Sequence, residues 1–171
     1  SPINIFCGLS GTTMRLMTSI ACLSESKVVI DGERRLRKRP MKDLLLALNE
    51  LGIDVESENR DFLLPIIIKG GKLKGGEIRL SGNISSQFIS ALLLISPFAE
   101  NDTTIVVKDL RSEPYVDITV DLMKTFGVKV ENKGNSYKVK MGQKYTSRKY
   151  TVEGDYSSAS YFFAAAFITD S

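Results

Sequence analysis

Histidine is absent from the 171-residue chain, and this absence excludes whole classes of chemistry. Ser-His-Asp and Cys-His catalysis, imidazole acid–base catalysis and zinc sites with histidine ligands all need that side chain. Any chemistry within this polypeptide must therefore use Lys, Arg, Asp, Glu, Ser, Thr or Tyr.

Cysteine is scarce, and no apolar run is long. Cys7 and Cys22 lie fifteen positions apart without a Cys-x-x-Cys motif, which is typical of reduced core thiols in a cytoplasmic protein; one disulfide between them is the alternative. The longest apolar stretches, 88–99 and 161–168, contain serine or end well short of the roughly 18 residues that a membrane helix needs. We expect a cytoplasmic protein with no membrane span and no signal peptide.

Charge of one sign is not in large excess. Lys and Arg number 23 against 20 Asp and Glu, and a net charge of +3 is too small to indicate bulk binding to nucleic acid or membranes. The composition, 43% apolar and 25% charged, is that of a globular protein with a substantial core.

What the chain does contain is an internal repeat. Turns that combine Gly with Ser or Thr begin at Gly8, Gly82 and Gly154, at intervals of 74 and 72 residues, and each precedes an apolar helix pattern. This spacing predicts that the same structural unit recurs along the chain.

Landmarks in the second half of each repeat agree with this interpretation. Pro40 and Pro114 lie where a helix can begin, and Gly52 and Gly127 lie where a left-handed helix cap is needed. An alternating pattern around residues 133–135 predicts a hairpin. Each unit is thus predicted to run strand, helix, strand, helix, hairpin.

The sequence therefore predicts an α/β domain built by duplication of βαβαββ units. Residues 1–150 hold two units and form most of a first domain, whereas residues 151–171 begin a third unit or cross over toward a second domain. Because the chain starts directly on a strand and stops directly after an apolar helix, we expect it to be part of a longer protein.

The predicted helix starts are candidate anion sites, because a helix N-terminus has unpaired N–H groups and Ser or Thr adds hydroxyl donors. Arg15 follows Gly11 by about one turn and interrupts an apolar helix, where a guanidinium could bind phosphate or carboxylate. Ser85, Ser86 and Gln87 form the polar end of a helix that is apolar almost all round. Plain N-capping is the alternative for each Ser and Thr.

The densest positive charge is a cluster of five cations after the second predicted strand. Three interpretations are open: a nucleic-acid or localisation patch, a solvated loop, or a loop that delivers arginines to an anionic site. Its place directly after a strand favours the third. The equivalent loop of the second unit offers Ser112 and Tyr115 and is much less basic. The cluster consists of Arg34, Arg35, Arg37, Lys38 and Arg39.

Sequence motifs for common cofactors are missing. No Walker-type Gly-x-x-x-x-Gly-Lys-Ser/Thr motif occurs, and no group of carboxylates has the spacing of a metal site. The glycine-rich stretch 70–76 is not followed by a helix pattern. We therefore expect neither a nucleotide cofactor nor a metal.

Five stretches carry a more specific signal. They are GTTMR (11–15), DGERRLRKRP (31–40), SSQFISALL (85–93), PYVDIT with LMKTFGV (114–119 and 122–128), and VEGD with SSASYF (152–155 and 157–162). In these stretches, and in their order, the chain resembles the family of 5-enolpyruvylshikimate-3-phosphate synthases, also called 3-phosphoshikimate 1-carboxyvinyltransferases.

This resemblance implies a fold, a reaction and partners. Members have two domains, each of three βαβαββ units with helices inside and sheets outside. They transfer the enolpyruvyl group of phosphoenolpyruvate to the 5-hydroxyl of shikimate 3-phosphate, in the shikimate pathway of aromatic amino acid biosynthesis, without metal or organic cofactor. Two anionic substrates suit clusters of arginine and hydroxyl groups. The expected full-length enzyme is a cytoplasmic monomer without nucleic-acid or membrane partners.

The matched stretches also assign site residues. On the phosphoenolpyruvate side the resemblance places Gly11 and Arg35, and it gives Arg15 only a supporting electrostatic role. No metal ligand and no catalytic residue is expected in this segment. The residues expected to contact shikimate 3-phosphate are Ser85, Ser86, Gln87, which also lies near phosphoenolpyruvate, Ser112 and Tyr115.

The family's acid–base groups, which lie in a lysine motif near its N-terminus and in its second domain, have no counterpart here. We therefore expect weak binding of shikimate 3-phosphate without turnover, because an incomplete cleft leaves much of a ligand in water. Leu9 and Arg34 also depart from the family's usual Asn and Pro. Two alternatives stay open: a related transferase acting on a UDP-amino sugar, and a nucleic-acid-binding module that uses the cluster from Arg34 to Arg39.

Overall fold

The structure, a computed structural model, describes residues 2–81, 85–108 and 113–169. Its first unit has the predicted order of elements. The elements are strand β1 (Ile3–Phe6), helix α1 (Gly11–Ala21), strand β2 (Val28–Asp31), the short 3₁₀ helix η1 (Leu36–Lys38), helix α2 (Lys42–Glu50), strand β3 (Ile53–Ser57) and strand β4 (Ile66–Gly71).

The second unit repeats this order, so the predicted duplication of βαβαββ units is confirmed. It comprises β5 (Gly76–Ser81), α3 (Ser86–Ile95) with the 3₁₀ helix η2 (Ser96–Phe98), β6 (Thr103–Lys108), α4 (Glu113–Thr125), β7 (Val130–Asn132) and β8 (Ser136–Val139). A last helix, α5 (Tyr156–Thr169), follows a segment without regular secondary structure.

Each unit forms one four-stranded sheet, and the two sheets have the same topology. Their strand orders are β1-β2-β4-β3 and β5-β6-β8-β7. In each sheet the first two strands are parallel and the closing hairpin is antiparallel. Buried apolar pairs occupy equivalent positions: Ile30 lies opposite Ile66, and Ile105 lies opposite Tyr137.

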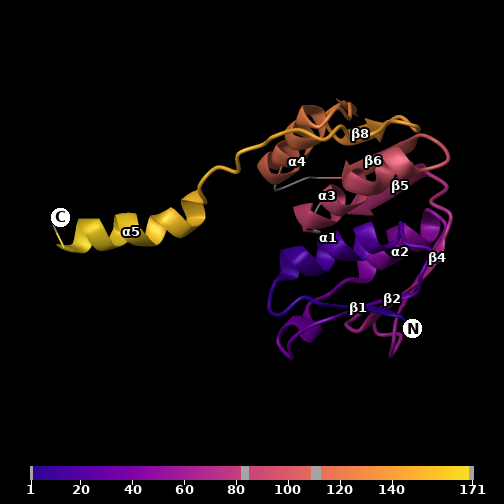
Figure 1. The fold of residues 1–171 in the computed structure, drawn as a ribbon, viewed down its shortest axis with the longest axis horizontal. Coiled ribbons are helices and arrows are strands. Elements are labelled where there is room, and N and C mark those ends of the chain that lie inside the picture. The colour runs from indigo at the N-terminus through magenta and orange to yellow at the C-terminus, as the bar shows by residue number, and fades with distance from the viewer. Residues whose placement is uncertain (1, 82–84, 109–112, 170–171) are drawn as a thin grey trace.

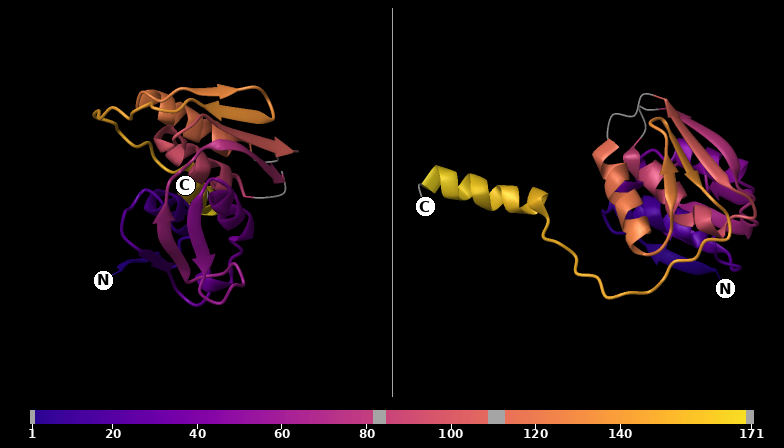
Figure 2. Two further views of the ribbon diagram at one scale, coloured as in Figure 1. Left: turned by 90° about the vertical axis from the view of Figure 1, so that its right-hand side faces the viewer. Right: turned by 90° about the horizontal axis from the view of Figure 1, so that it is seen from above.

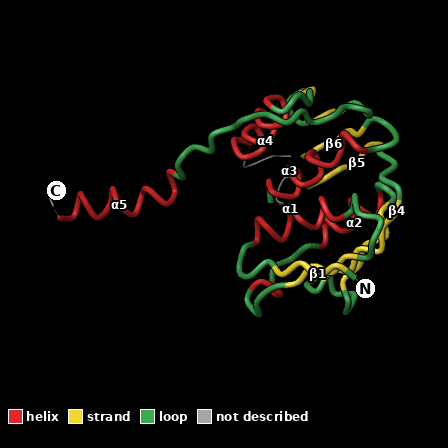
Figure 3. Tube along the Cα trace, viewed as in Figure 1, coloured by secondary structure: helices red, strands yellow, loops and turns green. Residues whose placement is uncertain are grey.

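The helices lie inside and the sheets outside, as the family resemblance implies. Figures 1 and 3 show α1, α2 and α3 between the two sheets, with α1 packed along α3. Helix α3 can occupy this position because it is apolar almost all round, and every one of its residues except Gln87 and Leu94 is buried. The core therefore surrounds α3.

Glycine caps end the second helix of each unit. Gly52 and Gly127 have φ values of +96° and +92°, in the left-handed region where a side chain is disfavoured. Pro114 is the second residue of α4, whereas α2 begins two residues after Pro40, so the expected start at Pro40 is slightly early.

The two cysteines confirm the prediction of reduced core thiols. Cys7 and Cys22 are buried and free. Burial raises the pKa of both thiols, to about 12 for Cys22, where desolvation is the largest cause. Cys7 also lies in the field of Asp31, which raises its pKa further.

Helix α5 stands apart from the two units. Figures 1 and 2 show it projecting away from them, and none of its described residues is buried. Phe162 is 77% exposed and Phe167 is 89% exposed, so the apolar surface of α5 has no partner within the described part of the chain. In that same part, no helix combines the length and hydropathy needed to cross a membrane.

The central position of α3 predicts an unequal response to leucine truncation. Leu92→Ala, in α3 and fully buried, should lower the free energy of unfolding by about 3 kcal/mol because it leaves a cavity. The matched control Leu46→Ala, in α2 at 46% exposure, should cost less than about 1 kcal/mol. Urea denaturation measures both, and equal losses would contradict the central placement of α3.

Candidate functional site

Helices α1 and α3, the first helix of each unit, both begin with a serine cap. Ser10 Oγ accepts a hydrogen bond from the Thr13 N–H at 3.1 Å ahead of α1. Ser85 Oγ accepts one from the Gln87 N–H at 3.3 Å ahead of α3. The N-capping interpretation is therefore correct for Ser85, but this side chain also has a second partner.

Arg15 connects the two helix starts. Its Nη1 donates to Gln87 Oε1 at 2.8 Å and to Ser85 Oγ at 3.2 Å. In turn, Gln87 Nε2 donates to Thr12 Oγ1 at 2.9 Å. The amide of Gln87 is thus oriented from both sides, and side chains some 70 positions apart in the sequence join the two units at this point.

The surroundings of Arg15 suit a positioning role. Its guanidinium carbon lies 5.0 Å from the centroid of the Phe88 ring, and its Nε is buried without a hydrogen-bond partner among the described residues. Burial, and then the positive charge of Arg39, lower the pKa of Arg15. Because an arginine stays protonated even so, the site keeps this charge.

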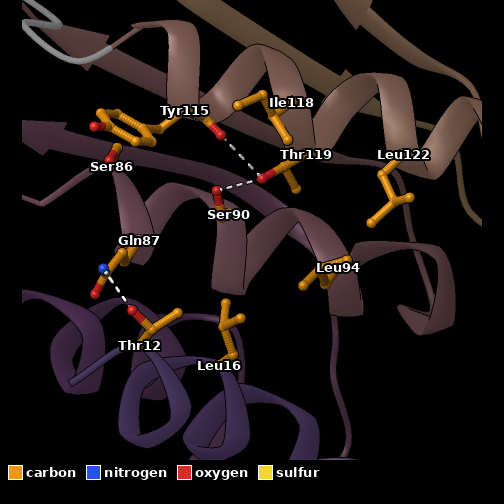
Figure 4. A pocket seen from close by; sticks show the side chains of 10 residues that line it. All are labelled: Thr12, Leu16, Ser86, Gln87, Ser90, Leu94, Tyr115, Ile118, Thr119 and Leu122. Carbon is orange, nitrogen blue, oxygen red and sulfur yellow. Dashed lines mark hydrogen bonds between the residues drawn. The ribbon is translucent and has the colours of Figure 1, made fainter. Parts of the chain in front are cut away.

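A cavity of about 480 Å³ opens beside this network (Figure 4). One end is polar: Gln87 and Thr12 are hydrogen-bonded to each other there, and Ser86 and Tyr115 also line the cavity. Helices α3 and α4 are tied across it by the Ser90 and Thr119 hydroxyls, 2.7 Å apart. The lining residues are Thr12, Leu16, Ser86, Gln87, Ser90, Leu94, Tyr115, Ile118, Thr119 and Leu122.

A second cavity, of about 270 Å³, lies where the basic loop meets the turn before α1. It is lined by Leu9, Arg35, Leu36 and Arg39. Arg37 of the same cluster does not line it, because its Nε donates to Asp31 Oδ1 at 2.9 Å and its Nη2 pairs with the other carboxylate oxygen. The cluster is thus divided between an ion pair and a cavity.

The structure places most of the expected site residues around these two cavities. Ser86, Gln87 and Tyr115 line the first, while Arg15 and Ser85 hold Gln87 in place. Arg35 lines the second, next to Arg39, which in turn lies against Gly11. Ser112 lies outside the described residues.

The polar residues of the site that were not predicted from the sequence are Thr12, Ser90, Thr119 and Arg39. Thr12, hydrogen-bonded to Gln87, occupies the position in the first unit that Ser86 occupies in the second, so the repeat could have predicted it. Arg39 had no comparable signal within the cluster. The third predicted helix start is not at this site, because it begins α5, which projects away from the two units. There the Ser158 hydroxyl donates to Asp155 Oδ2 at 2.6 Å.

Carboxylates are missing from the lining of both cavities, which consists of hydroxyl, amide, guanidinium, phenol and apolar groups. Among the described residues, no group of three or more Cys, Asp or Glu side chains is placed to hold a metal ion. The arrangement can bind and orient anions, but it presents no carboxylate to exchange a proton with a ligand.

Comparison with known proteins identifies the family. The family model for EPSP synthase (3-phosphoshikimate 1-carboxyvinyltransferase) matches residues 1–171. The chain belongs to this family. It is 44% identical to the 3-phosphoshikimate 1-carboxyvinyltransferase of Methanocaldococcus jannaschii over 174 aligned positions and 46% identical to that of Erwinia tasmaniensis over 170. The two alignments cover 100% and 98% of the chain.

The solved structure of EPSP synthase from Acinetobacter baumannii has the same fold. It superposes on 96% of the chain with a TM-score of 0.81 at 29% identity. These matches cover only 36% of that structure and 41% and 40% of the two curated relatives. The chain therefore spans about 40% of the length of the EPSP synthases it matches.

The bridge made by Arg15 predicts energetic coupling between the starts of α1 and α3. Arg15→Ala removes the donor to Gln87 and Ser85 and should lower the free energy of unfolding by about 1–3 kcal/mol. In a double-mutant cycle with Gln87→Leu, the losses should fall short of additivity by at least about 0.5 kcal/mol, because both changes break one interaction.

A matched cycle supplies the control. Arg79 and Glu77 form an exposed ion pair at 2.7 Å on strand β5, and their coupling should be smaller than that of the bridge. Urea denaturation of both sets of variants gives the comparison. Additive losses for Arg15 and Gln87 would show that no bridge exists.

Proposed function

We propose that this chain is the shikimate-3-phosphate-binding part of an enzyme that transfers the enolpyruvyl group of phosphoenolpyruvate to the 5-hydroxyl of shikimate 3-phosphate. In that reaction a new C–O bond forms at the hydroxyl and inorganic phosphate leaves. One observation carries the proposal: the bridge from Arg15 to Gln87 gathers the polar groups of both units at one end of a cavity of about 480 Å³.

The polar end of this cavity suits a phosphate ester. Ser86 and Tyr115 offer hydroxyl donors, and the first turn of α3 offers backbone N–H groups beside them. The apolar wall of Leu16, Leu94 and Leu122 can cover a ring. Gln87 stands between this cavity and Arg15, so it can orient a second anion next to the first.

The proposed role is binding rather than turnover by this chain alone. Neither cavity has a carboxylate or lysine in its lining, so we expect the proton donor and acceptor of the reaction to belong to other parts of a longer enzyme. The chain spans about 40% of its curated relatives, which supports this view. In this proposal residues 1–150 form most of the first domain.

Helix α5 has a place in the same proposal. A 14-residue apolar helix with no buried residue needs a partner to pack against. In this proposal residues 151–171 begin a further unit or cross over to a second domain, which provides that partner. A cytoplasmic location is also part of the proposal, and the two free, buried thiols support it.

Calorimetric titration with shikimate 3-phosphate tests the proposed function. Weak binding to the chain is expected, and Ser85→Ala with Gln87→Ala should weaken it at least about tenfold by removing charge-assisted hydrogen bonds. Tyr115→Phe, at an exposed position, should weaken it less, with no effect on folding. Lys38→Ala, on the exposed face of η1, is the control and should change nothing.

Two outcomes would contradict the proposal. Formation of the enolpyruvyl product by the purified chain would show that its own residues supply the acid–base groups. Salt-dependent binding of DNA or RNA at physiological ionic strength, lost in Arg35→Ala with Arg37→Ala, would favour the nucleic-acid-binding module. The ion pair between Arg37 and Asp31 speaks against such a surface, because it occupies one of the five cations of the cluster.

A further inference from the structure

The backbone beside Arg39 is held firmly against the start of α1. The Glu33 N–H donates to the Gly8 carbonyl oxygen at 2.9 Å, and Leu36 is buried at 1% exposure. A Cβ on Gly32 would lie 2.5 Å from Leu36 Cδ2, so the turn packs with no room to spare. The Arg39 N–H then donates to the Leu36 carbonyl oxygen at 2.9 Å, which places this residue at the end of η1.

The side chain of Arg39 occupies the space that a side chain at position 11 would fill. A Cβ on Gly11 would lie 2.8 Å from Arg39 Nη1 and 3.5 Å from Arg39 Cδ and Cζ. Gly11 is the buried first residue of α1. Any side chain there would push the Arg39 guanidinium away from the helix start, while the flexible arginine could move without unfolding the chain.

The lining of the cavity beside Arg39 has positive charge and no carboxylate. Arg35 and Arg39 line the same cavity of about 270 Å³, and neither forms an ion pair with the described residues. The positive charge of Arg39 also contributes to lowering the pKa of Arg15. Like charges held together raise the energy of the free site, and a bound anion would lower it.

We infer that Arg39 is an anion-binding residue that shares a phosphorylated carboxylic acid with Arg35, and that the missing side chain of Gly11 is what lets its guanidinium reach the site. This inference rests on the proposed function, in which phosphoenolpyruvate is that acid. A ligand with a phosphate and a carboxylate has more charge than one guanidinium balances, and two arginines on one cavity match it.

Side-chain NMR of the full 171-residue chain, titrated with phosphoenolpyruvate and separately with inorganic phosphate, tests the inference. The Nε–H signals of Arg35 and Arg39 should shift together with one affinity. Arg39→Ala should weaken phosphoenolpyruvate binding at least about tenfold. Arg39→Lys should weaken it less, because lysine keeps the positive charge and loses only the bidentate hydrogen bonding of the guanidinium. Lys38→Ala, the neighbouring exposed cation, should leave the affinity unchanged.

A second cycle separates the role of Gly11 from direct contact. Gly11→Ala should weaken phosphoenolpyruvate binding in the wild-type background and add nothing in the Arg39→Ala background, because its effect acts through the displaced guanidinium. An equal loss in both backgrounds would mean that the methyl group meets the ligand itself, and would overturn this part of the inference.

Shikimate 3-phosphate binding, measured on the same variants, keeps the two proposals distinguishable. If shikimate 3-phosphate still binds while phosphoenolpyruvate does not bind, or binds equally well after Arg39→Ala, the inference fails and the proposed function stands. If shikimate 3-phosphate does not bind but phosphoenolpyruvate binding depends on Arg39, the proposed function fails and the anion site stands.

Discussion

A half-buried guanidinium needs acceptors, and Arg15 finds them in the other repeat unit. Its hydrogen bonds to Gln87 and Ser85 link the start of α1 to the start of α3. The glutamine amide then has its oxygen and nitrogen committed, since it also donates to Thr12. The proposed site for shikimate 3-phosphate depends on this link, because the link places the polar starts of two helices side by side.

The duplicated topology makes that link available. In each unit the helix that follows the first strand, α1 or α3, begins after the carboxyl end of that strand, where α/β folds bind ligands. The sheets cover the outside, and the inner helices α1 and α3 pack together. The basic cluster is divided locally. Arg37 pairs with Asp31 at the end of β2, while Arg35 and Arg39 line a cavity.

The fold could be predicted well from local signals, and the site only partly. Gly52, Gly127 and Pro114 mark helix ends through backbone conformations that depend on few neighbours. The repeat and the order of its helices and strands could therefore be predicted from the sequence. The hydrogen bond from Arg15 to Ser85 could not be predicted, because the two residues lie 70 positions apart and meet only through the packing of α1 on α3. The sequence also did not distinguish Arg39 from the other cations of the cluster, because its contact with Gly11 is visible only in the structure.

Amide NMR of the isotope-labelled chain, titrated with shikimate 3-phosphate, tests most directly whether the two helix starts form one site. If they do, the N–H signals of Thr12 in α1 and of Ser86 and Gln87 in α3 should shift together and report one affinity. Signals that shift only in the basic loop around Lys38, or at one helix start without the other, would contradict a shared site.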